Sequence, residues 1–526
     1  MSITAITIEN FKGIKEPVRV ELKPLTLLFG PNSAGKSTIV QALHYAREIF
    51  ERHNLDPDQT LLGGDAIDLG GFQSIVHGHD LSLPVTLRFD LDLTDEDLPG
   101  YLSDALEPEE GLWPLMGVKA GWVELTIRWS RLNEKPLITA YETGLDCHPV
   151  ARISCSEDGK QIYISFLNFD HPMYVDDPSL PWEEQASHLE EVVQQGLRLA
   201  GKTSRNGNDV FLPLALERSV LPAWGHELGF QEEEGPVGDI EQFRFYRNQA
   251  IGLLSSSIVG PGELVRDALR RFCYIGPLRE VPKRNHKPAN SPEASRWSNG
   301  LAAYDTLFFS DEAFITKVNG WLTQDDRLAT GYSVEVKKYR ELENNHPLML
   351  AMLQGRILDD DMDLRKQLLS LPILRRLLIR DEARDIELAP QDIGVGISQV
   401  LPVVVAALQR KTGFVAIEQP ELHIHPALQV ALGDLFIEQI RERDDLVFLL
   451  ETHSEHLLLR FLRRIRETGE GEVEKNKKLV PDELAVYFME QGGDGLVCHR
   501  INVDEDGDFL DRWPHGFFAE RAGELF

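Results

Sequence analysis

The spacing of apolar and polar residues changes several times along the chain. Over the first 45 residues, two short apolar runs of strand type are followed by a Gly-rich turn and then by helical spacing. From about residue 81 to residue 167, apolar residues recur at every second position, which predicts half-buried antiparallel strands. Beyond residue 413, short apolar runs alternate with helical segments, as in α/β domains. Between these regions, from about residue 183 to residue 380, helical spacing dominates, for example at Leu368, Leu369, Ile373, Leu374, Leu377 and Leu378.

These changes predict an α/β fold and divide the chain into four segments. Residues 1–80 and 381–526 carry the strand–helix alternation and are expected to form the two halves of one head. Residues 81–175 are expected to form an antiparallel β subdomain, and residues 176–380 a mainly helical insertion. The length of 526 residues agrees with this division, because about 150 residues per domain suggests roughly three structural units.

Composition narrows the classes of protein that fit. Hydrophobic residues make up 42% of the chain, which is enough for large buried cores and excludes general disorder. The formal net charge of −31 repels nucleic acid and anionic membranes at long range, so contact with DNA or RNA requires a local basic patch. The four cysteines are scattered, and neither a signal peptide nor an apolar run of membrane-spanning length is recognisable. We therefore expect a reduced, cytoplasmic protein that does not enter a membrane.

The first candidate for chemistry is the Gly-rich turn, which lies directly after an apolar strand and opens a helix. It matches the P-loop pattern G-x-x-x-x-G-K-[ST], in which backbone N–H groups surround a phosphate and the helix N-terminus adds partial positive charge. Lys36 is expected to reach the β- and γ-phosphates of a nucleotide, and the Ser37 hydroxyl to bind Mg²⁺. The predicted nucleotide-binding residues are Gly30, Pro31, Asn32, Ser33, Ala34, Gly35, Lys36, Ser37 and Thr38.

Two further strand ends fit a phosphate site of this kind. A P-loop needs an acid at the end of a neighbouring strand to help hold Mg²⁺, and the apolar run Val415–Ile417 ends in Glu418. About thirty residues later, a second buried strand ends just before His453. If both strands end at the edge that carries the P-loop, His453 is placed to contact the γ-phosphate or the attacking water.

A Gly/Ser segment precedes the apolar helix that begins near Val400. Gly394, Gly396 and Ser398 could cap that helix and do nothing more. The same arrangement also suits a phosphate, because it combines backbone N–H groups, a hydroxyl and a helix dipole. The residues alone leave both interpretations open.

Taken in order, these motifs resemble those of ABC-type ATPase heads, and most closely those of the RecF-, SMC- and OLD-related group. Flanking segments agree, among them Tyr274–Arg279 in mid-chain and residues 506–518, which resemble the tail of a prokaryotic ATPase branch of unknown role. The resemblance implies a split ABC-type P-loop ATPase head, with the β subdomain and the helical domain inserted between its halves. It also implies that two heads meet head-to-tail and enclose two molecules of ATP with Mg²⁺.

The same resemblance assigns roles to residues outside the P-loop. Gly396 and Ser398 are expected to reach the γ-phosphate that Lys36 of the other copy binds. Gln73 is expected to correspond to the Q-loop glutamine of the group and to contact Mg²⁺.

One position departs from the pattern of the group. The magnesium acid is usually followed by a glutamate that activates the attacking water, but Gln419 stands here and cannot act as a carboxylate base. Glu421 is the nearest remaining carboxylate in the sequence, and His453 could help to polarise the water. Phosphoryl transfer depends mainly on positioning and charge stabilisation, so we expect slow hydrolysis and long-lived ATP-bound assemblies.

Basic residues gather in two stretches of this acidic chain. Such residues either form a solvated surface balanced by neighbouring acids or bind the phosphates of DNA, RNA or a partner. The first stretch contains Arg266, Arg270, Arg271, Arg279, Lys283, Arg284 and Lys287, and the second contains Arg460, Arg463, Arg464, Arg466, Lys475, Lys477 and Lys478.

The resemblance implies an ATPase that controls a separate effector, which in prokaryotic relatives is often a nuclease acting in anti-phage defence or DNA repair. No nuclease motif is recognisable in this chain. Two alternatives stay open: a RecF/SMC-like repair ATPase that binds DNA directly, and a scaffold in which ATP gates assembly without being hydrolysed.

Overall fold

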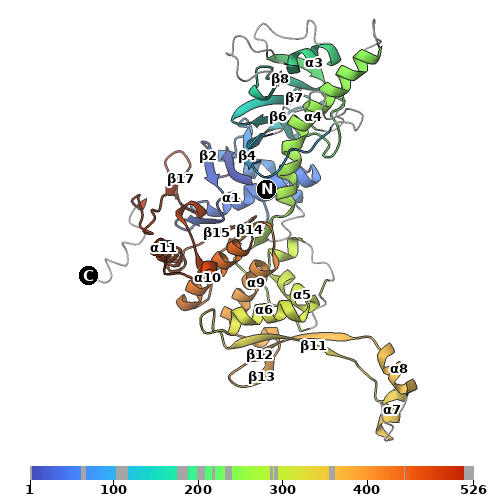
Figure 1. Cartoon of the computed structure of the whole chain (residues 1–526), viewed down its shortest axis with the longest axis vertical. Coiled ribbons are helices and arrows are strands. Elements are labelled where there is room, and N and C mark those ends of the chain that lie inside the picture. Colours follow the sequence, from blue (N-terminus) through green and yellow to red (C-terminus); the bar gives the residue numbers. More distant parts are fainter. Residues whose placement is uncertain are drawn as a thin grey trace.

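The computed structural model describes most of the chain and shows three connected parts (Figure 1). The described residues are 3–60, 67–101, 117–174, 188–197, 208–215, 219–231, 240–284, 288–289, 294–354, 362–443 and 445–514.

The central part is a six-stranded sheet built from segments that are far apart in the sequence. Its order is β10–β14–β15–β3–β16–β17, and all neighbours are parallel except β16 and β17. Its inner strands are continuous buried apolar runs, as expected for parallel strands covered on both faces. The strands are β3 (Leu25–Phe29), β10 (Cys273–Ile275), β14 (Gly413–Glu418), β15 (Leu446–Glu451), β16 (Leu484–Gln491) and β17 (Leu496–Ile501).

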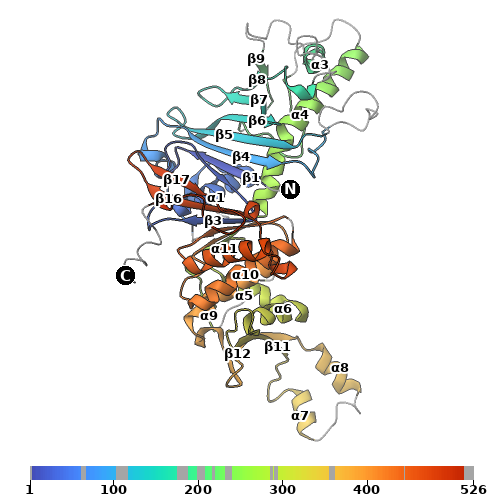
Figure 2. The same ribbon diagram turned by 60° about the vertical axis from the view of Figure 1, so that its left-hand side comes forward.

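Alternate side chains of this sheet enter two different hydrophobic cores. In β14, Ala416 packs on one side with α1 and α4, whereas Val415 and Ile417 pack on the other side with α9, α10 and α11. The helix that follows the P-loop and the helix that follows the Gly/Ser segment therefore cover opposite faces of one sheet (Figure 2). These helices are α1 (Lys36–Arg52), α4 (Ile240–Arg270), α9 (Val395–Gln409), α10 (Pro426–Glu442) and α11 (Glu455–Gly469).

The second part is an antiparallel sheet of eight strands, against which α4 packs (Figure 2). The strands expected over residues 81–175 lie in it, but the sheet also takes in three strands from outside that segment, because β1 pairs with β4 and β9 pairs with β8. The order is β2 (Val18–Glu21), β1 (Ile3–Glu9), β4 (Val85–Asp92), β5 (Ala120–Ser130), β6 (Lys135–Leu145), β7 (His148–Cys155), β8 (Ile162–Leu167) and β9 (Asp209–Pro213), with α2 (Phe72–Ile75) and α3 (His188–Leu197) beside it.

The third part carries a projection that we call the arm, formed by β11, β12, α7 and α8. Figure 1 shows the two strands leading away from α5 and α6 to the two short helices at the far end. Their bounds are α5 (Leu301–Phe309), α6 (Glu312–Thr323), β11 (Tyr332–Tyr339), α7 (Pro347–Leu353), α8 (Met362–Ser370), β12 (Leu374–Asp381) and β13 (Ile386–Leu388).

The arm corrects one expectation from the sequence. The spacing of Leu374, Leu377 and Leu378 favours a helix, but these residues form β12, the central strand of the sheet β11–β12–β13. Pairing on both edges and packing of Leu377 and Ile379 against the helices outweigh the local spacing. The segment expected to be mainly helical also supplies β9, β10 and β11, and β10 belongs to the central sheet of the head.

Within the described residues, every helix is too short or too polar to cross a membrane.

Candidate nucleotide-binding site

The P-loop joins β3 to α1 at the carboxyl ends of the parallel strands. Gly30 has a φ of 149° and Gly35 a φ of 85°, values that L side chains rarely adopt. A Cβ atom on Gly30 would lie 2.2 Å from the carbonyl oxygen of Met489, so the close approach of β16 also requires glycine at this position. The sequence pattern therefore has a direct structural cause in the path of the loop.

Lys36 is the first residue of α1, and its side chain is only 4% exposed. Its Nζ donates to the carbonyl oxygens of Gly30, at 3.1 Å, and Pro31, at 3.0 Å, and lies 3.9 Å from Oε1 of Glu451. Burial lowers the pKa of Lys36, and nearby carboxylates oppose this shift. The ammonium group is thus held inside the loop, next to the acids at the strand ends.

Two glutamates end neighbouring parallel strands at this edge and pair directly in the register: Glu418 on β14 and Glu451 on β15. The Ser37 hydroxyl donates to Oε2 of Glu451 at 2.7 Å, and the Tyr274 hydroxyl donates to Oε1 of Glu418 at 3.0 Å. Burial and the charge of Glu451 raise the pKa of Glu418 to about 7, and burial also raises the pKa of Glu451. A divalent cation bound between them would favour ionisation of both.

Glu451 is a candidate site residue that the sequence analysis missed. It stands directly before the Thr-His-Ser segment, where attention fell on His453. Its signal is the same as that of Glu418, namely an acid that ends a buried apolar strand. Only the pairing of β14 with β15 shows that the two acids are adjacent.

Glu421 holds two loops together. Its two carboxylate oxygens accept hydrogen bonds from Oγ1 of Thr452, at 2.8 Å, and from the backbone N–H of His453, at 2.7 Å. The acid bonded to Ser37 is Glu451, and a role of Glu421 in the reaction stays a prediction. Glu421 connects the end of β14 to the segment that carries His453.

Gln419 follows β14 in a left-handed backbone conformation, with a φ of 47°. Its N–H donates to the carbonyl oxygen of Glu451 at 2.7 Å. A non-glycine residue in this region costs free energy, and such residues cluster at functional sites. The backbone of Gln419, which stands where the resembled group has its catalytic glutamate, is therefore held by a hydrogen bond to the end of β15.

His453 provides a direct test of whether the site fits a nucleotide. Its Nε2 is buried and has no hydrogen-bond partner among the described residues. Burial, together with the charge of Lys36, lowers its pKa, so the ring is neutral at pH 7. A buried polar atom without a partner is costly unless a ligand satisfies it. The P-loop, the Mg²⁺-type acids and this ring nitrogen together fit a nucleotide phosphate with its metal ion.

The Gly/Ser segment forms the N-terminus of α9. The Ser398 hydroxyl donates to the carbonyl oxygen of Val395 at 2.8 Å, and the residue is only 3% exposed. In this structure the hydroxyl therefore makes a hydrogen bond within the first turn of α9. The outer edge of the turn is different: the side chain of Val395 is 59% exposed, and Gly394 has no neighbour near the position of a Cβ atom. Contact of Gly396 and Ser398 with a nucleotide on another copy stays a prediction.

Gln73 does not join the other site residues. Its side chain is exposed and lines a hollow together with His53 and Trp129. His53 caps the C-terminal end of α1, whereas Ser37 lies at the N-terminal end of the same 17-residue helix. Such a helix is about 25 Å long, so the structure does not place Gln73 beside the magnesium acids.

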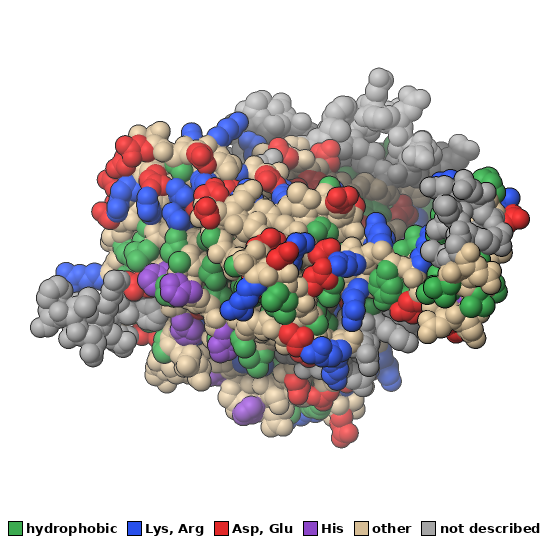
Figure 3. All heavy atoms as spheres, turned by 90° about the horizontal axis from the view of Figure 1, so that it is seen from below, with side chains coloured by type: hydrophobic (Ala, Val, Ile, Leu, Met, Phe, Trp, Pro, Cys, Tyr) green, Lys and Arg blue, Asp and Glu red, His purple; other side chains and the backbone are tan. Residues whose placement is uncertain are grey.

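The two basic stretches do not form surfaces of one sign. In the first, Arg279 is buried and Lys287 lies outside the described residues. Seen from the end that carries the arm, Lys and Arg side chains are intermixed with Asp and Glu (Figure 3). In the second stretch, Arg460 and Arg464 pair with Asp434, Arg463 with Glu467, Arg466 with Asp508, and Lys477 with Glu474.

Three segments of the chain match known protein families. Residues 1–65, which include the P-loop, match a family described as "AAA ATPase domain". Residues 323–460, which include Glu418 and His453, match one described as "AAA domain, putative AbiEii toxin, Type IV TA system". Residues 479–526 match a family described as a protein of unknown function. Both halves of the head thus match AAA-type ATPase families, in agreement with the predicted P-loop ATPase, and the predicted α/β fold is confirmed.

Solved structures of SMC head domains align with nearly the whole chain at low identity. An SMC head bound to the C-winged helix domain of ScpA covers 96% of this chain and 99% of its own, with 9% identity and a TM-score of 0.41. The head from Thermotoga maritima covers 96% and 100%, with 8% identity and a TM-score of 0.36. A Pyrococcus furiosus Smc head with an extended coiled coil, bound to the C-terminal domain of ScpA, covers 99% and 98%, with 10% identity and a TM-score of 0.36. No curated protein matches the chain in sequence.

Proposed function

We propose that this AAA-type ATPase binds ATP with Mg²⁺ at the P-loop, associates with a second copy through the bound nucleotide, and so controls a partner effector in prokaryotic anti-phage defence. The observation that carries the proposal is the arrangement of Lys36, Ser37 and two strand-end glutamates beside the buried, unpartnered Nε2 of His453. Each of these groups suits one part of a nucleotide–magnesium complex. The Lys36 ammonium would bind phosphate, the Ser37 hydroxyl and the glutamates would bind the metal ion, and the His453 ring nitrogen would bind phosphate or water.

Slow hydrolysis follows from the groups available to the attacking water. Gln419 can orient water through hydrogen bonds but cannot accept its proton as a carboxylate does. Glu421 is occupied by Thr452 and His453, and the neutral His453 ring can only assist. We therefore expect turnover well below the range of about 1–100 s⁻¹ that is typical of kinases. Restoring the usual acid with Gln419→Glu should leave turnover unchanged or raise it.

Association through the nucleotide is supported by the exposed edge of the α9 N-terminus. A helix N-terminus favours an anion, and Gly394 leaves room for a phosphate of another copy to approach the backbone N–H groups. The side chain of Val395 is exposed at the same edge, where a second copy would cover it.

The test replaces Val395 with arginine, which adds bulk at this edge without disturbing the buried side of α9. Light scattering should show that ATP raises the mass of the wild-type particle but not that of Val395→Arg, while each subunit still binds ATP with unchanged affinity. Leu132→Arg, at an exposed position 70% accessible in the β5–β6 turn, is the matched control and should associate normally. Normal ATP-dependent association of Val395→Arg would reject this surface.

Control of a separate effector is supported by the chain's own motifs. The sequence has a complete P-loop but no recognisable nuclease motif, so destructive chemistry would belong to another protein. Co-purification from the native host identifies that protein: an effector retained with wild type and released from Lys36→Ala supports control by nucleotide.

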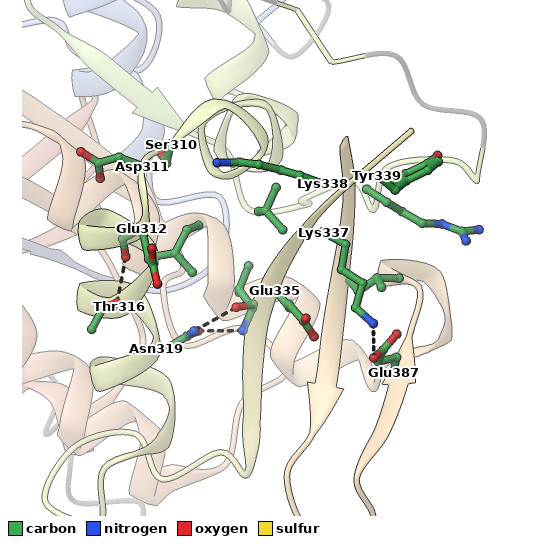
Figure 4. A pocket seen from close by; sticks show the side chains of 15 residues that line it. Ser310, Asp311, Glu312, Thr316, Asn319, Glu335, Lys337, Lys338, Tyr339 and Glu387 are labelled. Atoms are coloured by element: carbon green, nitrogen blue, oxygen red, sulfur yellow. Dashed lines mark hydrogen bonds and ion pairs between the residues drawn. The ribbon is translucent and has the colours of Figure 1, made fainter. Parts of the chain in front are cut away.

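Direct binding of nucleic acid is a second candidate function, and the charge pattern of the arm favours it. Lys337 lies opposite Arg376, and Lys338 opposite Arg375, in the register of β11 and β12. Like charges directly opposite each other destabilise an antiparallel pair, so this pattern needs another reason in a chain of net charge −31. Figure 4 shows Lys337 turned to Glu387, whereas Lys338 and Arg376 have no ion pair among the described residues.

Binding by this pattern is tested with labelled double-stranded DNA at several salt concentrations. If phosphates contact the arm, Lys338→Glu with Arg376→Glu should weaken binding and lower the slope of log affinity against log salt by about 2. Arg463→Glu on α11 is the control, since Arg463 is already paired with Glu467. An unchanged slope, or no binding by wild type, would reject the candidate.

A further inference from the structure

Arg279 is a buried arginine that no part of the nucleotide site accounts for. It follows β10 in the mid-chain segment, is 4% exposed, and lies between the first turn of α9 and the end of β14. The sequence analysis placed it in a basic stretch open to phosphate, and its burial excludes that role.

On one side, Arg279 is tied to Gln399 by a reciprocal pair of hydrogen bonds. The backbone N–H of Arg279 donates to Oε1 of Gln399 at 3.2 Å, and Nε2 of Gln399 donates to the carbonyl oxygen of Arg279 at 2.8 Å. The guanidinium adds a third bond, from NH1 to the carbonyl oxygen of Gln399 at 3.2 Å. The segment after β10 is therefore fixed to the beginning of α9, one residue beyond Ser398.

On the other side, the same guanidinium holds the backbone at the end of β14. Its NH2 donates to the carbonyl oxygens of Glu418, at 2.7 Å, and Gln419, at 3.2 Å. These are the magnesium acid and the residue at the position of the catalytic base. One planar side chain thus connects α9 to the backbone of Glu418 and Gln419.

The acceptors make this an unusual way to bury a charge. Among the described residues, every hydrogen-bond acceptor of the guanidinium is a neutral carbonyl oxygen, and its Nε has no partner. Burial lowers the pKa of Arg279 to about 10, so it remains a cation at pH 7. The charges of Glu421 and Glu418 partly offset this burial, but neither carboxylate is hydrogen-bonded to the guanidinium, so burying the cation still costs free energy. The planar fork does, however, match two backbone segments at once, which a lysine cannot do.

We infer that Arg279 and Gln399 couple association to hydrolysis: contact of a second copy with the first turn of α9 sets the backbone of Glu418 and Gln419 through this link. Arg279 is a positioning residue in this account, because its guanidinium bonds to backbone carbonyl oxygens. The inference rests on the proposed nucleotide-driven association and adds the route by which association reaches the hydrolytic groups.

The test separates binding, association and turnover in Arg279→Lys, which keeps the charge and loses the fork. We expect unchanged ATP affinity, preserved ATP-dependent association, and kcat lowered at least about tenfold with little change in KM. Wild-type turnover per subunit should rise with protein concentration as copies associate, and in Arg279→Lys this rise should be absent. Gln399→Met removes the reciprocal bonds at similar volume and should give the same result.

Arg443→Lys is the matched control. The Arg443 guanidinium also donates to carbonyl oxygens of α9, those of Ala407 and Leu408, but at the far end of the helix. This variant should lose stability in the same way and keep the concentration-dependent rise in turnover. Wild-type turnover rates in both Arg279→Lys and Gln399→Met would overturn the inference, even if wild type associates. Failure of wild type to associate with ATP would instead contradict the proposed function.

Discussion

Lys36→Ala should weaken ATP binding at least about 100-fold, or by about 3 kcal/mol, because it removes a buried cation that makes charge-assisted bonds to phosphate. The P-loop segment from Gly30 to Ser37 contains no other cationic side chain. In the structure the ammonium already lies inside the loop, bonded to the Gly30 and Pro31 carbonyl oxygens. Isothermal calorimetry measures the loss.

Two controls make that result specific. Lys160→Ala, at a side chain 81% exposed in the β7–β8 turn, should leave ATP affinity unchanged. Thermal unfolding of Lys36→Ala should confirm that the variant is folded. Wild-type ATP affinity in a folded Lys36→Ala protein would contradict the P-loop assignment.

The second large effect concerns the paired glutamates. Glu418→Gln and Glu451→Gln should each reduce Mg²⁺-dependent turnover at least about 100-fold, because each removes one of two adjacent carboxylates from the metal site. ATP binding in the absence of Mg²⁺ should persist in both, since the P-loop is unchanged. Phosphate release measured over a Mg²⁺ titration distinguishes the two steps.

Glu421→Gln tests whether Glu421 joins Glu418 and Glu451 at the metal site. The Glu421 carboxylate accepts hydrogen bonds from Thr452 and His453, and an amide at this place would leave one donor poorly paired. We expect a loss of about 1–3 kcal/mol in stability with no change in the Mg²⁺ concentration for half-maximal turnover. A shift in that concentration as large as in Glu451→Gln would mean that Glu421, too, contacts the metal.

The pH dependence of the metal requirement is a further readout. The pKa of Glu418 is raised to about 7, and Mg²⁺ binds the ionised form. Below this pH, protons compete with the metal, so the Mg²⁺ needed for half-maximal turnover should fall as pH rises through 7 and level off above it. In Glu418→Gln this contribution should disappear.

The sequence predicts the contiguous P-loop well, but it does not predict which distant residues lie beside the loop. The roles of Gly30, Gly35 and Lys36 can be predicted because a phosphate-binding loop is formed by consecutive residues with a recognisable pattern. The role of Glu451 depends on which strand lies beside β14, and that pairing joins segments more than thirty residues apart. Arg279 illustrates the same limit: as a charge in a basic stretch it suggests a surface, but the pairing of β10 with β14 places it inside the molecule.

Contacts between distant segments also limit what the sequence predicts about the sheets. Period-two spacing correctly indicates the antiparallel strands. Their sheet also includes β1 and β9, because a strand can pair with any free edge of a sheet, however distant the two are in the sequence. The leucines of β12 fit a helical spacing, and pairing with β11 and β13 decides otherwise. Tertiary contacts between distant segments determine both outcomes.

Mixing two inactive variants tests the central claim most directly. Lys36→Ala lacks a functional P-loop but keeps the α9 edge, whereas Val395→Arg has the reverse defect. If one copy completes the nucleotide site of the other, a mixed pair contains one intact composite site. An equal mixture should then release more phosphate than the two variants measured separately, up to about half of the wild-type rate, since each mixed pair has one of two sites. Phosphate release no greater than the sum of the two variants measured separately would contradict the account.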